Sequence, residues 1–251
     1  MKPRMLIALD LDDTLYFNSW LTAARVANAV RQFHTKRLGH DDGYAMRLFE
    51  EHGTALRGTA AGRDFAMQAW LLFESGKSRG RIFDATLAAM GITDPALVEK
   101  LVTIYRSHPP HIKLTLDAEA FLSRHPPETL ALITNGPAMT QRNKIAALRL
   151  RDRIAMIIVT DELGEHGAKP SVRPFQIAQG GREANECVYI GDNPAVDFEG
   201  PRQLGWQQSI RVRRAGSLHV DVATPPDCEE IATLADVGIK LPGFDAAKKK
   251  V

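Results

Sequence analysis

Short apolar runs alternate along this chain with longer segments in which apolar residues recur at helical spacing. Runs of this length that are apolar on both faces predict buried strands. From the second run onward, helical segments separate them: residues 137–150 open with Pro137, and residues 171–180 stop at a glycine. This alternation is typical of a parallel sheet covered by helices on both faces. The predicted strands are 5–9, 130–133, 156–159 and 188–190, with a weaker one at 207–212.

Residues 17–110 show several amphipathic segments and almost no strand pattern. The chain leaves the predicted sheet after its first strand and returns through the proline-rich segment 107–116, which is typical of a linker. We therefore expect an α/β protein with a Rossmann-like core, formed by residues 1–16 and 111–251, and an inserted all-α domain, formed by residues 17–110. The predicted helices of the insertion are 20–38, 41–53, 62–75, 82–91 and 95–105.

Composition places the chain among ordinary globular proteins and excludes several function classes. Of its 251 residues, 44% are hydrophobic and 25% charged, and the formal net charge of +2 is too small for a surface that coats nucleic acid. The N-terminal apolar run ends at Leu9, too short for a signal peptide or a membrane-spanning helix. Cys187 and Cys228 stand apart and form no metal-binding pair. We expect a cytoplasmic protein without a nucleic-acid or membrane partner, and we make no prediction of its oligomeric state.

Polar side chains follow several of the predicted strands at the point where each strand ends. Asp10 follows the first run, Thr134 and Asn135 follow the second, and Asp192 comes soon after the fourth. Each group alone is equally well explained as a helix cap or a turn. Because the carboxyl ends of parallel strands face one crevice, where ligands bind, their shared position indicates a single site.

Four aspartates would gather at this crevice, namely Asp10, Asp12, Asp192 and Asp197. Two unit charges about 4 Å apart repel by about 4 kcal/mol at an effective dielectric near 20, so the group needs compensation. A divalent cation and Lys169, which lies in the loop after the third run, would offset three charges, and protonation of a general acid would remove the fourth. Oxygen ligands favour Mg²⁺. Such a site suits a phosphoryl group, which an aspartate can attack to form an aspartyl-phosphate.

Four segments of the sequence resemble, in order, the signature segments of the haloacid dehalogenase-like (HAD) hydrolase superfamily. They are DLDDT at 10–14, ITNG at 133–136, KP at 169–170 and GDNPAVD at 191–197. Most members of this superfamily are magnesium-dependent phosphatases with a HAD-like α/β core. The resemblance also implies that the insertion 17–110 is a helical cap that closes over the substrate and excludes water.

The resemblance implies a catalytic role for two of the aspartates. Asp10 would be the nucleophile, and Asp12 would protonate the leaving oxygen and then activate the water that splits the aspartyl-phosphate. Thr134 and Lys169 would bind the transferred phosphoryl group, with Asn135 beside them.

The resemblance also implies a set of metal ligands. Mg²⁺ would be held by the carboxylates of Asp10 and Asp192 and by the backbone carbonyl of Asp12. Asp197 would bind the water around the metal or Lys169, and Asn193 would lie in the same outer layer.

The expected function is therefore hydrolysis of a small phosphomonoester, with nucleoside monophosphates and sugar phosphates as candidate substrates. A dehalogenase is an alternative, although Asp12 argues against it, because displacement of a halide leaves no oxygen to protonate. A phosphomutase would keep the same four segments, so an assay must separate the two. A non-catalytic binding module would not need both Asp10 and Lys169.

Two further features concern substrate choice and departures from the superfamily pattern. The basic segment 76–83 of the predicted cap is either a solvated surface, which we favour, or a patch that recognises a second part of the substrate. The cap pattern is similar to that of pyrimidine 5'-nucleotidase-like members. Asp13 stands where many members carry glycine, and Pro201 is expected to kink or delay the helix after the fourth segment.

Overall fold

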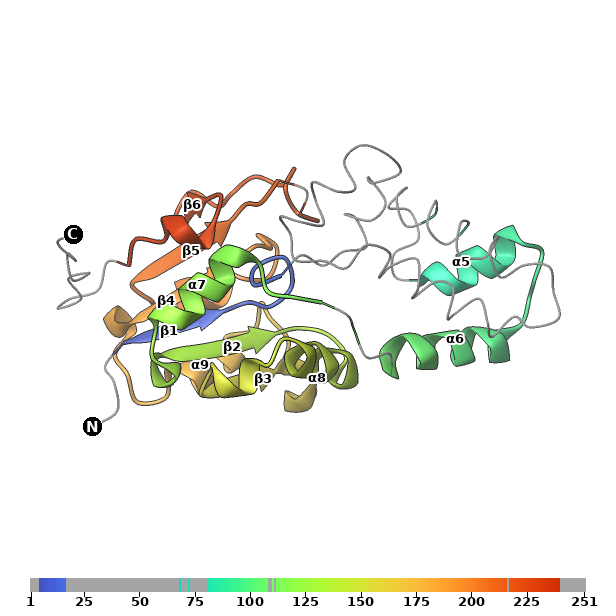
Figure 1. The fold of residues 1–251 in the computed structure, drawn as a ribbon, viewed down its shortest axis with the longest axis horizontal. Coiled ribbons are helices and arrows are strands. Elements are labelled where there is room, and N and C mark those ends of the chain that lie inside the picture. The colour runs from blue at the N-terminus through green and yellow to red at the C-terminus, as the bar shows by residue number, and fades with distance from the viewer. Residues whose placement is uncertain are drawn as a thin grey trace.

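Six parallel strands form one sheet. The computed structural model describes residues 5–16, 68, 72, 81–107, 110, 112–215 and 217–239. The strands lie in the order β3-β2-β1-β4-β5-β6, and every neighbouring pair is parallel (Figure 1). Their bounds are β1 Leu6–Leu9, β2 Leu130–Thr134, β3 Met156–Val159, β4 Cys187–Gly191, β5 Gln208–Val212 and β6 Glu229–Ile231.

The apolar runs predict five of these strands to within one residue at each end. Burial explains this success, because each residue of β1, β2 and β4 is buried and must be apolar or small. β6 was not predicted. Its sequence, EEI, has no apolar run, and it lies at the edge of the sheet, where only Ile231 is buried.

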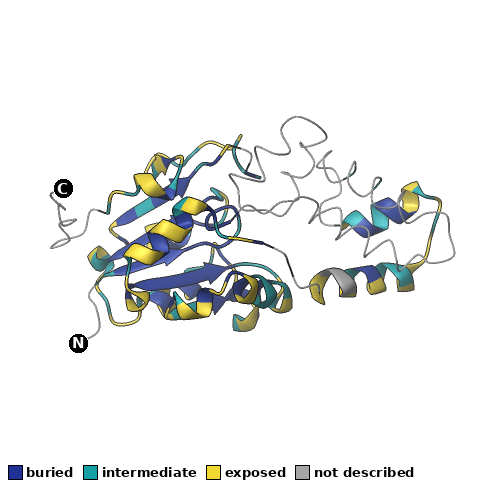
Figure 2. Cartoon of the chain, viewed as in Figure 1, coloured by how far each residue is buried: buried dark blue, intermediate teal, exposed yellow. Residues whose placement is uncertain are grey.

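Helices cover both faces of the sheet, as predicted. Alternate residues of β1 point to opposite faces, so Ile7 and Leu9 belong to one buried cluster and Leu6 and Ala8 to another. The first cluster includes residues of α7 and α8, and the second includes residues of α9. Figure 2 shows the buried sheet between helices whose outer sides are exposed. The helices are α5 Ile82–Ala89, α6 Pro95–Ser107, α7 Leu116–Arg124, α8 Ala138–Ala147, α9 Arg173–Gln179 and α10 Glu199–Gln203, with 3-10 helices η2 Pro127–Thr129, η3 Leu150–Asp152, η4 Thr160–Leu163, η5 Ala184–Glu186 and η6 Leu234–Asp236.

The order of the strands creates a crevice beside β1. The chain runs from β1 to β2 and β3 on one side, then crosses to β4 on the other side. The carboxyl ends of β1 and β4 stay in register, since Leu9 pairs with Ile190 and the backbone N–H of Asp10 donates to the carbonyl of Ile190 at 2.9 Å. Ligands of open α/β sheets bind at such a reversal of strand order.

Two of the predicted helices of the insertion lie among the described residues. α5 and α6 match the predicted segments 82–91 and 95–105, and the described part of 17–110 contains no strand. The other three segments lie outside the described residues, apart from positions 68 and 72. The end of α6 meets the core, where the side-chain amide of Asn143 donates to the carbonyl of Ser107 at 3.3 Å. The domain boundaries and the capping role stay predictions. In the part of the chain that the structure describes, no helix is long and apolar enough to cross a membrane.

The expectation for Pro201 is wrong in one respect. α10 spans Glu199–Gln203 with Pro201 as its third residue, so the proline lies inside the helix and does not delay its start. The first turn of a helix tolerates proline, because the N–H groups there have no intrahelical acceptor. The helix is nevertheless short, at five residues.

We expect Gly200→Ala to destabilise the fold by about 1–3 kcal/mol, because an added methyl group would overpack the core. The methyl carbon would overlap the ring of Phe175, which is fully buried against α10. Gly181→Ala is the control, since an added Cβ there meets no described atom within 4 Å. Urea unfolding of both variants measures the effect. Equal free energies of unfolding for the two variants would contradict this expectation, because the ring of Phe175 would then move aside at little cost.

Candidate active site

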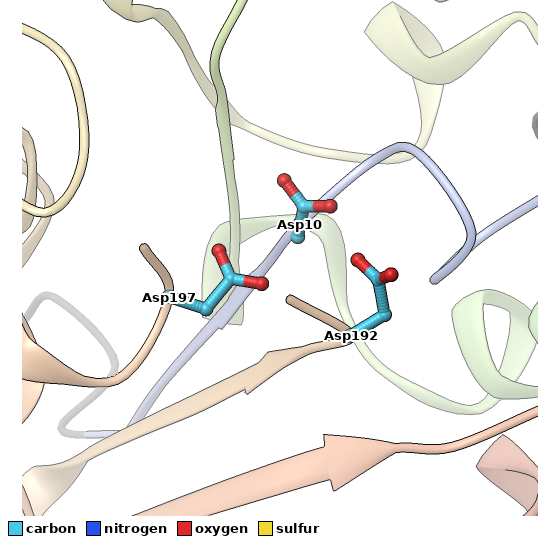
Figure 3. A group of neighbouring side chains, drawn as sticks. All are labelled: Asp10, Asp192 and Asp197. Carbon is cyan, nitrogen blue, oxygen red and sulfur yellow. The ribbon is translucent and has the colours of Figure 1, made fainter. Parts of the chain in front are cut away.

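Three buried carboxylates meet at the carboxyl ends of β1 and β4. Asp10 follows β1, Asp192 follows β4, and Asp197 lies in the loop before α10. One carboxylate oxygen from each lies within 4.8 Å of the others, and the three side chains gather around a common space (Figure 3). The positions of Asp10 and Asp192 at strand ends predicted that these two would meet.

Lys169 supplies a positive charge inside this group. Its ammonium donates to Oδ1 of Asp10 and Oδ1 of Asp197, both at 2.6 Å, and to the hydroxyl of Tyr189 at 2.9 Å. Only 4% of the residue is exposed. Burial opposes its positive charge, but Asp10 and Asp197 outweigh this effect and raise the pKa of Lys169. The lysine is therefore a permanent cation at this site.

Asp197 is fixed by several donors and by a close approach to the backbone. Besides Lys169, it accepts the hydroxyl of Tyr189 at 3.0 Å and the backbone N–H of Asn193 at 2.9 Å. A Cβ on Gly191 would lie 2.5 Å from Oδ2 of Asp197, so only glycine fits there. The segment GDNPAVD thus folds back on itself.

The predicted phosphate-binding residues of the second segment lie at different depths. Asn135 braces the backbone of Lys169: its Nδ2 donates to the carbonyl and its Oδ1 accepts the N–H, both at 2.9 Å. The same Oδ1 accepts the hydroxyl of Thr160 at 2.8 Å. Thr134 is buried, and its hydroxyl accepts from the amide of Gln141.

Asp12 is held by a separate group of residues that sequence reasoning missed. Lys144 of α8 donates to Oδ1 at 2.7 Å and to Oδ2 at 3.0 Å, and Gln141 donates to Oδ2 at 3.3 Å. The hydroxyl of Tyr16 also donates to Oδ1. Burial acts to raise the pKa of Asp12, but the ammonium of Lys144 and the hydrogen bonds from Lys144, Tyr16 and Gln141 together outweigh burial, and the pKa is lowered.

A small pocket of about 170 Å³ opens at these side chains. Its lining includes five aspartates but only one lysine. Of the predicted site residues, Thr134 alone is absent from the lining, which consists of Asp10, Asp12, Asp13, Asn135, Lys169, Asp192, Asn193, Val196, Asp197, Leu218 and His219.

A fully buried arginine joins the pocket wall to the sheet. Arg211 of β5 donates to the backbone carbonyls of Asp192, His219 and Val222 at 3.1, 2.7 and 2.7 Å, and to the hydroxyl of Thr224 at 2.7 Å. These contacts hold the loop after β5 against the end of β4. Nothing in the sequence distinguished this arginine from its neighbours in RVRR.

Asp13 adopts a left-handed backbone conformation, with φ of 55°. Aspartate tolerates this conformation better than most residues, which explains how it replaces the glycine that is common in the superfamily. Its carboxylate accepts the backbone N–H of Leu218 at 3.1 Å and so joins the first signature segment to the pocket wall.

The electrostatics of the pocket suit the binding of a cation. Burial raises the pKa of Asp10 to about 7, although the ammonium of Lys169 acts in the opposite direction. Burial also raises the pKa of Asp192 well above its ordinary value, and the charges of Asp13 and Asp10 add to the effect. Oδ2 of Asp192 is buried and has no hydrogen-bond partner among the described residues. A hard cation with oxygen ligands fits this arrangement.

Comparison with known proteins points in the same direction. No model of a protein family matches the chain. The chain is 28% identical to the phosphoserine phosphatase of Thermus thermophilus over 220 residues, which cover 80% of this chain and 85% of that protein. It is 25% identical to the glyceraldehyde 3-phosphate phosphatase of Methanocaldococcus jannaschii over 210 residues, covering 79% and 81%. Human N-acylneuraminate-9-phosphatase is 27% identical over 138 residues, covering 54% and 56%.

Solved structures share the fold over almost the whole chain. A putative HAD-hydrolase from Bacillus subtilis bound to magnesium has a TM-score of 0.54 at 19% identity, covering 93% of this chain and 96% of that one. A HAD-superfamily hydrolase of subfamily IA from Geobacter sulfurreducens has a TM-score of 0.56 at 13% identity, covering 92% of each. The chain therefore shares the fold of HAD-like hydrolases, and the curated relatives above are named as phosphatases. Both findings support the recognition made from the four signature segments.

The site combines residues of the four signature segments with partners that lie outside those segments. Gln141 and Lys144 lie in the helix after the second segment, and their three-residue spacing places them on one face. That spacing was the signal in the sequence that could have placed Gln141 and Lys144 in the site. It was not used, because polar residues on a helix usually face solvent. Tyr189 lies within an apolar strand, where a tyrosine is ordinarily part of the core.

We expect Mg²⁺ to stabilise the protein more at pH 8 than at pH 5.5. Because the pKa of Asp10 is raised from 3.8 to about 7 in the fold, the metal-free protein loses stability as the pH rises from about 4 to 7, and the loss is complete at pH 8. A bound cation removes that loss. At a concentration 100 times its dissociation constant, Mg²⁺ stabilises by about 2.7 kcal/mol. At about 2–4 °C per kcal/mol, thermal unfolding at pH 8 then shifts upward by about 5–10 °C.

Asp192→Asn provides the control for this measurement. Without metal at pH 8 the variant should be at least as stable as wild type, because one repelling charge is gone. It should also lose most of the shift caused by Mg²⁺. A shift of equal size in the variant would place the cation elsewhere.

Proposed function

We propose that this protein is a magnesium-dependent phosphatase that hydrolyses a small phosphomonoester through an aspartyl-phosphate on Asp10. The observation that carries the proposal is the contact of Asp10 with the buried cation Lys169, beside a carboxylate oxygen of Asp192 that has no described protein partner. The Thermus, Methanocaldococcus and human relatives support the class, since all three are named as phosphatases of small phosphorylated compounds.

The residues of this chain would divide the reaction into two balanced steps. In the first, an oxygen of Asp10 attacks phosphorus, the bond to the leaving oxygen breaks, and Asp12 gives that oxygen a proton. In the second, Asp12 takes a proton from water, the water oxygen attacks phosphorus, and the bond to Asp10 breaks. Inorganic phosphate then leaves, with Asp10 again ionised and Asp12 again protonated, as at the start of the first step.

Lys169 would neutralise the phosphoryl oxygens, and Asn135 would keep its backbone in place. Mg²⁺, when bound by the carboxylates of Asp10 and Asp192 and the carbonyl of Asp12, would supply further positive charge to the phosphoryl oxygens. Asp12 is ionised beside Lys144 in the free protein, which is the form needed in the second step. An incoming phosphate adds negative charge nearby and favours the protonated form needed in the first.

The alternatives have weaker support. Asp12 would have no leaving oxygen to protonate in a dehalogenase, and the Thermus, Methanocaldococcus and human relatives are phosphatases. A binding module would not need a nucleophile and a buried lysine together. A phosphomutase would use the same residues, but it would transfer phosphate rather than release it.

The basic segment 76–83 was the candidate for recognising a second part of the substrate. Arg81, the one residue of the basic loop that is described besides Ile82 and Phe83, pairs with Asp84 at 2.8 Å and is largely exposed. This agrees with a solvated surface at that position. Lys77 and Arg79 lie outside the described residues. Nucleoside monophosphates and sugar phosphates remain our candidate substrates.

We expect the protein to release inorganic phosphate from p-nitrophenyl phosphate and from some members of a panel of phosphorylated metabolites when Mg²⁺ is present. A chelator should abolish release. Asp10→Asn should lower turnover at least about 1,000-fold, because no covalent intermediate can form. Asp152→Asn, which changes an exposed aspartate of η3, is the control and should behave as wild type. Turnover that survives the chelator or Asp10→Asn contradicts the proposal.

A further inference from the structure

Asp12 is held by a second cation, which lies apart from the group around Lys169. Lys144 contacts both oxygens of the Asp12 carboxylate, at 2.7 and 3.0 Å, and 15% of its side chain is exposed. None of the four signature segments contains this lysine. It lies in the middle of α8, a helix otherwise explained by its packing on the sheet.

The contact between Lys144 and Asp12 belongs to a larger network of side-chain interactions. Gln141, which is buried one turn earlier in α8, donates to Asp12 and to the hydroxyl of Thr134. The hydroxyl of Tyr16 donates to the same carboxylate, and the Lys144 ammonium lies 5.8 Å from the centre of the Tyr16 ring. Both oxygens of Asp12 are therefore held, with Lys144 contacting both of them.

An orienting contact of this kind matters most for a proton donor. A general acid must lie within hydrogen-bond reach of the leaving oxygen, and its contribution falls steeply when it is misplaced. The Asp12 side chain is 28% exposed at the edge of the pocket, so without restraint it has room to change its rotamer. Lys144 is the one charged side chain whose contact with this carboxylate is described.

We propose that Lys144 is a positioning residue for proton transfer: it holds the Asp12 carboxylate at the pocket edge, where the leaving oxygen of the substrate must receive its proton. This inference rests on the proposed function. It assigns to α8 a part in catalysis, distinct from the phosphate-binding part of Lys169.

The dependence of the rate on the leaving group separates this role from a structural one. p-Nitrophenolate is a stable anion and departs with little help from an acid, whereas the alkoxide of glycerol is strongly basic and needs a proton as it departs. We would measure kcat/KM for p-nitrophenyl phosphate, phenyl phosphate and glycerol phosphate with Mg²⁺. This constant covers the steps up to phosphoryl transfer, so a slow second step does not hide the effect.

Lys144→Met should lower kcat/KM about 100-fold for glycerol phosphate and about fivefold or less for p-nitrophenyl phosphate, as expected for a misplaced general acid. Lys144→Arg should restore most of the loss, because it keeps the charge. Arg142→Met is the matched control: it removes a cation from the same helix that pairs with Glu162 and not with Asp12. It should leave the three values close to wild type.

Each outcome has a defined meaning. If wild type hydrolyses none of the three esters, the proposed function fails before Lys144 is tested. If wild type is active and Lys144→Met lowers all three values by the same factor, Lys144 is only structural and the inference is overturned. If Lys144→Met does not fold, as judged by circular dichroism, Lys144→Gln decides by the same comparison of leaving groups.

Discussion

The burial of several carboxylates around one lysine is the constraint on which this site depends. Asp10, Asp192 and Asp197 are almost fully removed from water, which is costly for ionised groups unless they are paired. Lys169 offsets part of their charge through two ion pairs. Asp192 keeps a buried oxygen without a described partner. A site of this kind favours binding of a cation together with an anionic group. The cation offsets the negative charge of the carboxylates, and the anionic group offsets the positive charge of the cation and Lys169.

Contacts from several elements hold the buried carboxylates and Lys169 in place. Gly191 lets Asp197 approach the backbone, Asn135 braces Lys169, and Arg211 ties the pocket wall to the end of β4. Asp12 belongs instead to the network of α8 around Lys144. The structure thus separates two cations, Lys169 beside Asp10, the proposed nucleophile, and Lys144 beside Asp12, the residue proposed to transfer protons. This separation is consistent with two different tasks in one reaction.

The sequence predicted the parts of the fold and site that follow from burial and topology. Asp10 and Asp192 were found because they follow apolar runs, and the carboxyl ends of parallel strands must meet. Lys144 was missed because a lysine in an amphipathic helix resembles a solvated residue, and its partner is 132 positions away in sequence. β6 was missed because an edge strand needs few apolar residues. The helix containing Pro201 shows that a breaker does not prevent a first turn.

Crystals grown with Mn²⁺ in place of Mg²⁺ would test the central claim most directly, because manganese also takes oxygen ligands and is located by its anomalous scattering. The account predicts one strong peak within coordination distance of the carboxylates of Asp10 and Asp192, with Lys169 close by but not bound to the ion. A structure with no peak at the carboxyl ends of β1 and β4, or with the ion bound only at another surface, would contradict it.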